Sequence, residues 1–305
     1  MRFERRRVKL GSVDFRTTID AASLQTLVGS PSVVILDCRF DLAAPDAGKQ
    51  AYLRRHIPTA RYVDLNRDLS APVSPASGRH PLPRPEHLAV VFGRLGVSSD
   101  TQVIAYDEIN GSFAARAWWL LRWLGHDRAA VLDGGLKAWL GAGGALESGE
   151  PQAPPRAATF APRPDSAAVV TAAEVLEAVQ DRRRLVVDAR APERFAGLVE
   201  PIDPVAGHVP GAINHPFTAN LREDGRFLAQ PELARRWRER LEGTAPTDVI
   251  AMCGSGVTAC HDLLALELAG LPGAKLYAGS WSEWIRDPKR PIARGSRASG
   301  SRAPG

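Results

Sequence analysis

The segment DVIAMCGSGVTACHDLLALELAG, residues 248–270, carries the main structural and chemical signal of this chain. It opens with a short apolar run rich in β-branched side chains, which is typical of a strand buried on both faces. The run ends at Met252, and the glycine-containing loop CGSG follows. A helix is predicted to begin near Val257 or Thr258 and to end at Gly270. The segment therefore reads as strand, loop and helix.

Four blocks of related sequence recur in the same order in the two halves of the chain. The pairs are VVILDCRF (33–40) with RLVVDARA (184–191), HIPTARYVDL (56–65) with HVPGAINHPF (208–217), QVIAYDEINGSFAARAWWLL (102–121) with DVIAMCGSGVTACHDLLALE (248–267), and LDGGLKAWL (132–140) with YAGSWSEWI (277–285). Their offsets stay between 145 and 152 residues, as expected for duplicated domains with small loop changes. Strands alternate with helices in each copy. This predicts an α/β fold of two tandem domains, each a mostly parallel sheet with helices on both faces.

The length of 305 residues also suits two domains. We expect a basic N-terminal tail (1–10), a first domain (11–146), a linker (147–168), a second domain (169–288) and a disordered basic tail (289–305). The linker begins ESGEPQAPPRAATFAPRPDS, which is rich in Pro and Ala and has no period. It is predicted to run extended over the surface.

The net charge of +5 is concentrated at the two ends of the chain. Residues 1–10 hold five Lys/Arg and one Glu, and residues 289–305 hold five Lys/Arg and no acid, which leaves −4 for residues 11–288. A folded nucleic-acid binder is expected to carry a basic face on the domain itself. We therefore expect solvated, mobile tails and no nucleic-acid partner.

Three cysteines, Cys38, Cys253 and Cys260, are too few for a disulfide framework and suit a reducing compartment. The chain has neither the apolar run of a signal peptide nor that of a membrane span, so we expect a cytoplasmic protein without a membrane partner. The cysteines lack CxxC spacing, the histidines are scattered, and no GxxxxGK loop occurs. We expect no metal and no cofactor.

Cys253 is the first residue after the predicted strand, at the start of the loop, and this position favours a reactive cysteine. Gly254 and Gly256 allow the backbone to bend and turn its N–H groups inward. With the positive end of the following helix, these groups form a cradle for an anion. A cysteine at its edge is expected to be a thiolate nucleophile. Packing as a small apolar side chain is the alternative, and it is the better interpretation of Cys38 and Cys260.

The loop CGSGVTA (253–259) resembles the active loop of the tandem rhodanese-type sulfurtransferases, in particular their 3-mercaptopyruvate branch. HIPTA (56–60) and HVPGA (208–212) resemble a further block of that family, with Thr59 replacing a glycine in the first copy. VLDGGLKAW (131–139) and LYAGSWSEW (276–284) resemble its end-of-domain block. The resemblance covers about residues 15–290.

The resemblance implies that the second domain is catalytic and the first is an inactive copy, with the active site between them. Asp107 stands in the first copy where Cys253 stands in the second, and a carboxylate cannot hold a transferable sulfur. Cys253 is then expected to take sulfur from 3-mercaptopyruvate as a persulfide, and to pass it to a thiol acceptor such as thioredoxin, or to cyanide. Backbone N–H groups of the loop are expected to stabilise the persulfide. The expected contacts are Gly254, Gly256, Val257 and Thr258.

Arg194 matches the family arginine that holds the carboxylate of the donor, and its planar fork suits this role. The alternative is an ordinary surface arginine. A second arginine is often found nine residues later in the mercaptopyruvate branch, but this chain has Asp203 there. Arg190 is a weaker candidate for the same role, and a structural ion-pair partner is the alternative for it.

The family also has a Ser–His–Asp relay beside the cysteine. Ser255 and His56 match it by motif, and Asp46 is our assignment for the third member. The alternative for His56 is a structural histidine bonded to the backbone, which is also the interpretation of His208.

Three other functions stay open at this point. The thiosulfate branch commonly has two basic residues where this chain has Gly254 and Ser255, so mercaptopyruvate is favoured as donor. A cysteine-dependent phosphatase needs an arginine six residues after the cysteine, where Ala259 stands. A persulfide carrier module that serves only protein partners is compatible with the same loop. Since tandem rhodaneses are often monomers, we expect a monomer.

Overall fold

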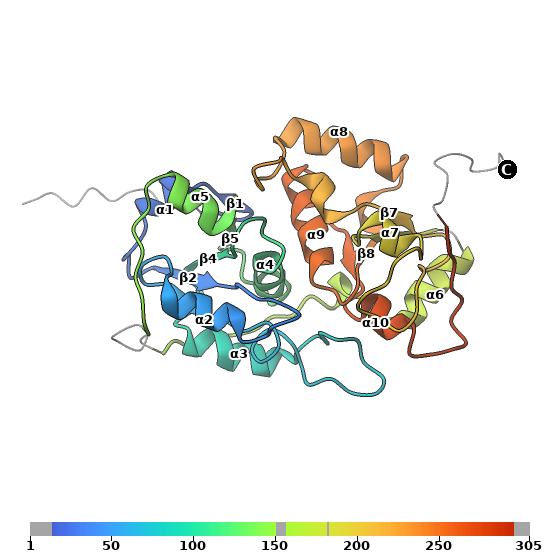
Figure 1. The fold of residues 1–305 in the computed structure, drawn as a ribbon, viewed down its shortest axis with the longest axis horizontal. Coiled ribbons are helices and arrows are strands. Elements are labelled where there is room, and N and C mark those ends of the chain that lie inside the picture. Colours follow the sequence, from blue (N-terminus) through green and yellow to red (C-terminus); the bar gives the residue numbers. More distant parts are fainter. Residues whose placement is uncertain (1–13, 151–156, 182, 296–305) are drawn as a thin grey trace, which may run out of the picture.

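The computed structural model describes residues 14–150, 157–181 and 183–295. They form two α/β domains that lie side by side, the first coloured blue to green and the second yellow to red in Figure 1. Each domain is built on a parallel sheet with helices on both faces, which confirms the predicted fold class.

The N-terminal sheet has five parallel strands in the order β1-β5-β4-β2-β3. They are β1 (Thr18–Ile19), β2 (Val33–Asp37), β3 (Arg61–Tyr62), β4 (Gln102–Tyr106) and β5 (Ala129–Leu132). The helices are α1 (Ala21–Gln25), α2 (Ala47–Arg54), α3 (Pro85–Arg94), α4 (Ala114–Trp123) and α5 (Gly135–Gly141). Side chains alternate along β2, so that Ile35 packs in the core with α1 and α5. Val34 and Leu36 pack in the core with α3 and α4.

The C-terminal sheet has four parallel strands in the order β7-β6-β8-β9. They are β6 (Leu185–Asp188), β7 (Ile213–Asn214), β8 (Val249–Met252) and β9 (Lys275–Leu276). The helices are α6 (Ala172–Asp181), α7 (Pro192–Phe195), α8 (Gln230–Leu241), α9 (Thr258–Leu268) and α10 (Ser280–Trp284), with short 3₁₀ helices η1 (Ser166–Ala168), η2 (Phe217–Asn220) and η3 (Pro246–Asp248). Along β8, Ile250 faces the core with α6, α7 and α10, whereas Ala251 faces the core with α8 and α9.

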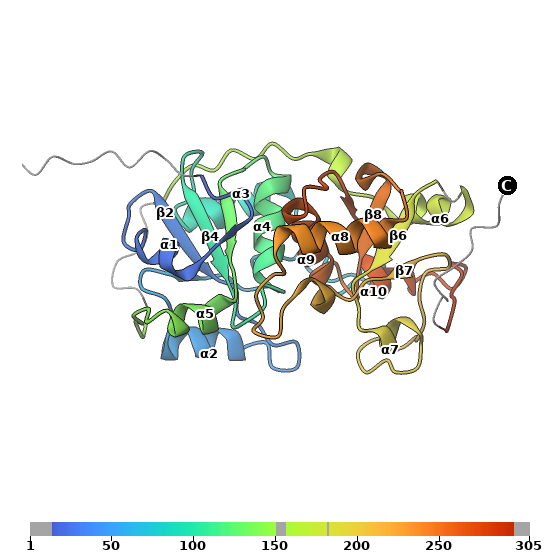
Figure 2. The ribbon, with the colours of Figure 1, turned by 90° about the horizontal axis from the view of Figure 1, so that it is seen from above.

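Helices α4 and α9 join the two domains. They lie side by side at the centre of the molecule (Figures 1 and 2). Trp118 and Leu121 of α4 and Leu263 and Leu264 of α9 belong to one apolar core that runs through both domains. Exposing this surface to water is unfavourable, so the packing holds the two domains together.

The segments that flank the predicted domain boundaries take part in specific contacts. Glu147 pairs with His56 through two backbone hydrogen bonds of 2.9 Å, and Phe160 is buried against Phe92. At the other end, Ala293 pairs with His208 in the same way. The predicted tail at 1–10 and residues 296–305 of the predicted tail at 289–305 lie outside the described residues. Residues 289–295 are described, and the pairing of Ala293 shows that this part of the predicted tail is ordered. Within the described ranges, no helix is long and apolar enough to cross a membrane.

Thr59 adopts a left-handed backbone conformation, with φ of 65°. Its counterpart in the second domain is Gly211, with φ of 79°. A β-branched side chain is strained in this region, whereas glycine is not. The departure of HIPTA from the glycine-containing block therefore carries an energetic cost.

We expect Thr59→Gly to raise the free energy of unfolding by about 0.5–1 kcal/mol, since relief of strain exceeds the entropy that glycine adds to the unfolded chain. Gly211→Ala in the second copy is the matched control and is expected to lower stability. Urea denaturation of the three proteins measures both effects. Equal stability of Thr59→Gly and wild type would show that the turn is unstrained.

Candidate active site

Cys253 lies directly after β8, at the carboxyl end of a strand paired on both sides. Its side chain is 2% exposed. The N–H of Gly256 donates to its sulfur over 3.1 Å. Gly256 has φ of 76°, and a methyl group there would lie 2.3 Å from the carbonyl oxygen of Ala278. Only glycine therefore fits where the loop turns its N–H toward the sulfur.

Ser280 fixes the backbone of Cys253 from α10. The N–H of Cys253 donates to Ser280 Oγ over 3.0 Å, and this hydroxyl donates to the carbonyl of Tyr277 over 2.9 Å. Ser280 is fully buried and has φ of 53°. A strained serine at this point is typical of a functional site held in shape by its surroundings.

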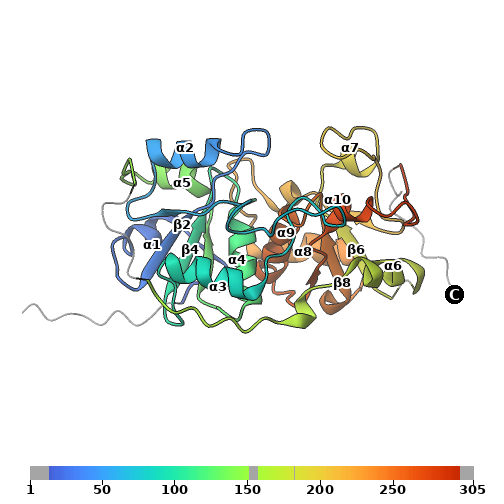
Figure 3. The same ribbon diagram turned by 90° about the horizontal axis from the view of Figure 1, so that it is seen from below.

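His80 is the partner of Ser255, with 2.7 Å between Nδ1 and the serine oxygen. It comes from the loop 63–84 of the N-terminal domain, which reaches across to α10 in Figures 1 and 3. The loop is held there by the N–H of Arg79, which donates to Ser282 Oγ over 3.0 Å. Burial, with the charges of Arg116 and Arg79, lowers the pKa of His80 to about 3, so the ring is neutral.

The relay assigned to His56 and Asp46 is wrong. His56 is buried, donates from Nδ1 to the carbonyl of Tyr52 over 2.9 Å, and stacks on the Tyr52 ring. Asp46 is exposed before α2 and pairs with Arg67 at 3.2 Å. Among the described residues, the histidine bonded to Ser255 is His80, and neither His56 nor Asp46 contacts this serine.

His208 repeats the role of His56 in the second domain. Its Nδ1 donates to the carbonyl of Phe195 over 2.8 Å, and its ring stacks on Phe195 at 3.9 Å between centroids. The same geometry in both copies shows that these two histidines hold turns, as expected for His208.

The sequence offered one signal for His80 that we did not use. It follows Arg79 in a loop of 22 residues, between β3 and α3, that has no counterpart among the repeated blocks. Loops of this length without secondary structure of their own are commonly functional.

Arg116 of α4 also enters the site from the N-terminal domain. It is fully buried and donates to the carbonyl of Gly256 over 3.2 Å. It also donates to the carbonyl of His80 over 3.4 Å. One guanidinium thus ties the cysteine loop to the segment that carries His80.

The loop residues assigned to substrate binding surround Cys253 in different ways. Gly256 contacts the sulfur, Val257 is buried before α9, and Thr258 begins that helix. A methyl group on Gly254 would lie 2.9 Å from Nη2 of Arg79 and 3.6 Å from both Nη atoms of Arg194. The loop itself has no basic residue, yet two guanidinium groups lie beside it.

Arg194 is held by Glu200. Its Nε and Nη2 donate to Oε1 over 3.0 and 2.6 Å. Burial alone would raise the pKa of Glu200, but the hydrogen bonds from Arg194 outweigh this effect and keep the pKa below its ordinary value. Nη2 of Arg194 also lies 3.3 Å from Oδ2 of Asp203. Glu200 and Asp203 thus position the guanidinium next to Gly254.

Arg190 forms a structural ion pair, which was the alternative to a role in donor binding. It donates from Nε and Nη2 to Asp188 and from Nη2 to the carbonyl of Gly207, and it lies over the ring of Trp281. Arg39 repeats the bidentate pair with Asp37 in the first domain.

Cys38 and Cys260 are buried in the core, as predicted. Burial raises the pKa of Cys260 to about 12, and it raises that of Cys38 well above its ordinary value. Neither thiol is suited to be a thiolate at neutral pH.

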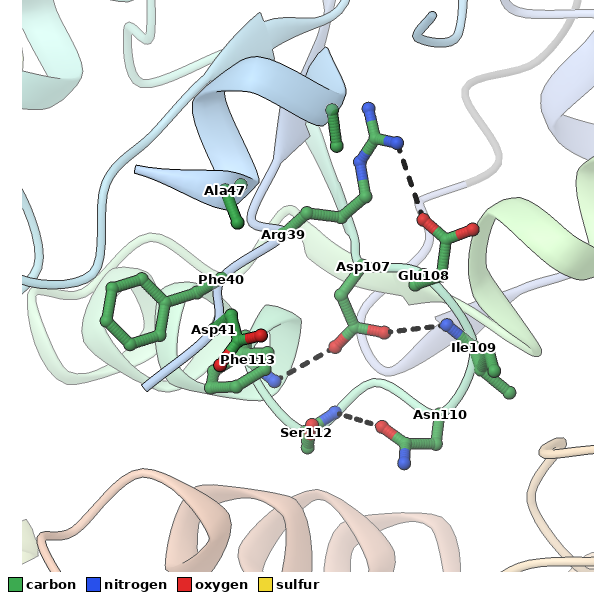
Figure 4. Close-up of a pocket in the computed structure, with 12 residues that line it drawn as sticks. Arg39, Phe40, Asp41, Ala47, Asp107, Glu108, Ile109, Asn110, Ser112 and Phe113 are labelled. Carbon is green, nitrogen blue, oxygen red and sulfur yellow. Dashed lines mark hydrogen bonds and ion pairs between the residues drawn. The ribbon is translucent and has the colours of Figure 1, made fainter. Parts of the chain in front are cut away.

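In the first domain, the carboxylate of Asp107 fills the loop that corresponds to the cysteine loop. One oxygen accepts from the N–H groups of Ile109 and Gly111 over 3.3 and 2.9 Å. The other accepts from those of Phe113 and Ala114 over 2.9 and 3.3 Å. Figure 4 shows this carboxylate pointing into its own loop. Burial raises the pKa of Asp107 even though the four N–H groups lower it.

A cavity of about 310 Å³ adjoins Asp107, lined by Arg39, Phe40 and Phe113 among others (Figure 4). It lies at the place in the first domain that corresponds to the site in the second, and not beside Cys253. Since Asp107 already occupies the N–H groups of its loop, these donors are not available to a molecule in the cavity.

The description "Rhodanese-like domain" fits residues 20–142 and 171–287, by comparison with models of known protein families. The chain therefore belongs to the tandem rhodanese-type sulfurtransferases, which confirms the resemblance drawn from the cysteine loop and the repeated blocks.

Individual relatives agree with this assignment. A protein from Pseudomonas aeruginosa named "Probable 3-mercaptopyruvate sulfurtransferase" is 50% identical over 279 residues, which cover 91% of this chain and 98% of that protein. The thiosulfate sulfurtransferase of Rattus norvegicus is 35% identical over 90% of this chain and 93% of its own. The crystal structure of SseA from Escherichia coli, described as a 3-mercaptopyruvate sulfotransferase, matches with a TM-score of 0.75 and 37% identity, over 88% of this chain and all of that one.

His80 is expected to stay neutral from pH 8 down to pH 5, as read from its imidazole nitrogens by NMR. Its folded pKa of about 3 lies below the unfolded value of 6.5, so the unfolded chain binds more protons between them. Stability present above pH 6.5 is therefore lost as the pH falls. From pH 8 to pH 5, the free energy of unfolding of wild type should therefore fall by about 2 kcal/mol relative to that of His80→Gln, which has no such titrating group. A difference independent of pH would contradict this.

Asp107→Asn is expected to lower the free energy of unfolding by about 2–3 kcal/mol, because the amide NH₂ faces two N–H donors. Asp133→Asn is the matched control, since Asp133 accepts from the N–H of Phe227 alone among the hydrogen bonds of the described residues, and an amide oxygen can replace that acceptor. Chemical denaturation compares the two. Equal losses would show that the Asp107 carboxylate is not needed to hold its loop.

Proposed function

We propose that this chain transfers a sulfane sulfur from 3-mercaptopyruvate to a thiol acceptor through a persulfide on Cys253. The observation that carries the proposal is the arrangement around Gly254. On one side of Gly254, the sulfur of Cys253 accepts a hydrogen bond from the N–H of Gly256. On the other side lie the guanidinium groups of Arg79 and Arg194, so close that a methyl group added to Gly254 would contact both. A donor with a sulfur at one end and a carboxylate at the other can present the sulfur to Cys253 and the carboxylate to these guanidinium groups.

In the first step the Cys253 thiolate attacks the sulfur of 3-mercaptopyruvate. The S–S bond forms and the C–S bond breaks, while the thiol proton of the donor ends on the carbon that becomes the methyl group of pyruvate. In the second step an acceptor thiolate attacks the outer sulfur, and Cys253 leaves as a thiolate. Such two-stage covalent transfer predicts ping-pong kinetics.

The residues around Cys253 have separate roles in this proposal. The N–H of Gly256 stabilises the anionic sulfur, since it points at that atom already. The hydrogen-bonded pair of Ser255 and neutral His80 carries the proton from the donor thiol to the departing carbon. Arg194 binds the carboxylate of the donor.

Thiosulfate is the second candidate donor. The loop lacks the basic residues that favour it, but Arg79 and Arg194 bring positive charge to Gly254 from outside the loop. The 35% identity to a thiosulfate sulfurtransferase also supports this donor. Mercaptopyruvate stays favoured because the relative at 50% identity carries its name.

The test is the intact mass of the reduced protein after incubation with 3-mercaptopyruvate and, separately, with thiosulfate. We expect a gain of about 32 Da with mercaptopyruvate, from one sulfur as a persulfide. Cys253→Ser is expected to abolish the gain, whereas Cys38→Ala and Cys260→Ala retain it. A gain with thiosulfate only would change the donor. No gain with either donor would overturn the proposal and favour a carrier loaded by a protein partner.

A further inference from the structure

Arg79 and Asp203 form an ion pair between the two domains, immediately beside the cysteine loop. Nη1 of Arg79 contacts Oδ1 of Asp203, and the other oxygen of this carboxylate lies 3.3 Å from Nη2 of Arg194. One carboxylate thus bridges two arginines, each of which lies close to Gly254.

Arg79 is held at this place by its backbone and not by the ion pair alone. Its N–H donates to Ser282 Oγ of α10, and the next residue, His80, is bonded to Ser255. The guanidinium therefore stays near the loop when its counter-ion changes. Its Nε is buried and has no hydrogen-bond partner among the described residues, so this arginine retains an unused donor.

The negative charge of Asp203 is held in an unfavourable environment. Its side chain is 4% exposed. Burial raises its pKa, and the neighbouring charge of Glu200 raises it further, against the lowering effect of Arg79 and Arg194. Glu200 already neutralises Arg194. Arg194 can therefore keep a counter-ion if Asp203 is displaced.

We propose that Arg79 is a second carboxylate-binding arginine of the active site, supplied by the N-terminal domain, and that Asp203 holds it until the carboxylate of an acid donor takes its place. This inference rests on the proposed function and names a specificity-determining residue for it. The bridging carboxylate of Asp203 and that of the donor have the same chemistry, and both require the same two guanidinium groups. Binding is then an exchange of one carboxylate for another between Arg79 and Arg194.

The two members of the pair should have opposite effects on donor binding. Arg79→Gln is expected to weaken binding of 3-mercaptopyruvate about 10- to 100-fold, as for loss of a charge-assisted hydrogen bond. Asp203→Asn keeps the shape but removes the competing charge, and is expected to tighten binding about 3- to 10-fold. A merely structural ion pair predicts losses of similar size in both variants.

The measurement is calorimetric binding of 3-mercaptopyruvate to chains that also carry Cys253→Ser, which cannot take up sulfur. Arg122→Gln is the matched control, since Arg122 of α4 also reaches across the domains, to Glu267 at 4.0 Å near the far end of α9. It is expected to leave binding unchanged. A poorly folded variant can only lose affinity for the donor. Tighter binding by Asp203→Asn therefore cannot be an effect of misfolding.

Opposite shifts for Arg79→Gln and Asp203→Asn support the inference. Shifts in the same direction, shifts no larger than that of Arg122→Gln, or no binding to the Cys253→Ser chain would overturn it. Sulfur loading of Cys253 is read separately by mass. Opposite shifts without loading of the wild type would count against the proposed transfer and leave the role of Arg79 standing.

Discussion

The packing of α4 against α9 is the constraint on which the site depends. Each helix starts from the loop that follows the central strand of its own domain, so their contact brings both loops to one interface. Arg116 of α4 then reaches the carbonyl of Gly256, and His261 of α9 reaches the carbonyl of Asn110 over 3.0 Å. Each loop is supported by the helix of the other domain. The N-terminal domain, which has Asp107 where the second domain has Cys253, therefore helps to shape the cysteine loop.

Local patterns in the sequence were enough to predict the fold and to single out the loop that begins at Cys253. The runs at β2, β4, β6 and β8 are apolar on both faces, and the glycines after Cys253 mark the loop. The strands β3 and β7 are only two residues long, which is too short for a pattern of apolar side chains. They are strands because each pairs with one neighbouring strand in the folded protein. Arg79 and His80 were missed for a related reason. Their loop belongs to the first domain in sequence and to the second in space.

The error over His56 has a physical lesson. The block that contains it occurs in both domains, whereas Cys253 of the second domain is matched by Asp107 in the first, so the block does not mark the domain that carries the cysteine. His56 and His208 each donate to a carbonyl and stack on an aromatic ring, which stabilises the same turn twice. His80, by contrast, has no counterpart in the second copy. Within a duplicated chain, the differences between copies locate the site better than the similarities.

The loop around Asp107 also limits what a single substitution could do in the first domain. Six residues separate Asp107 from α4, but four separate Cys253 from α9, and the longer loop wraps four N–H groups around two oxygens. A single sulfur offers one acceptor atom and would leave some of these donors unpaired. Replacing Asp107 by cysteine would therefore not by itself give a loop like that of Cys253, which is two residues shorter. The carboxylate and the longer loop depend on each other, and the first domain contributes to the second through Arg116, Arg79 and His80 rather than through this loop.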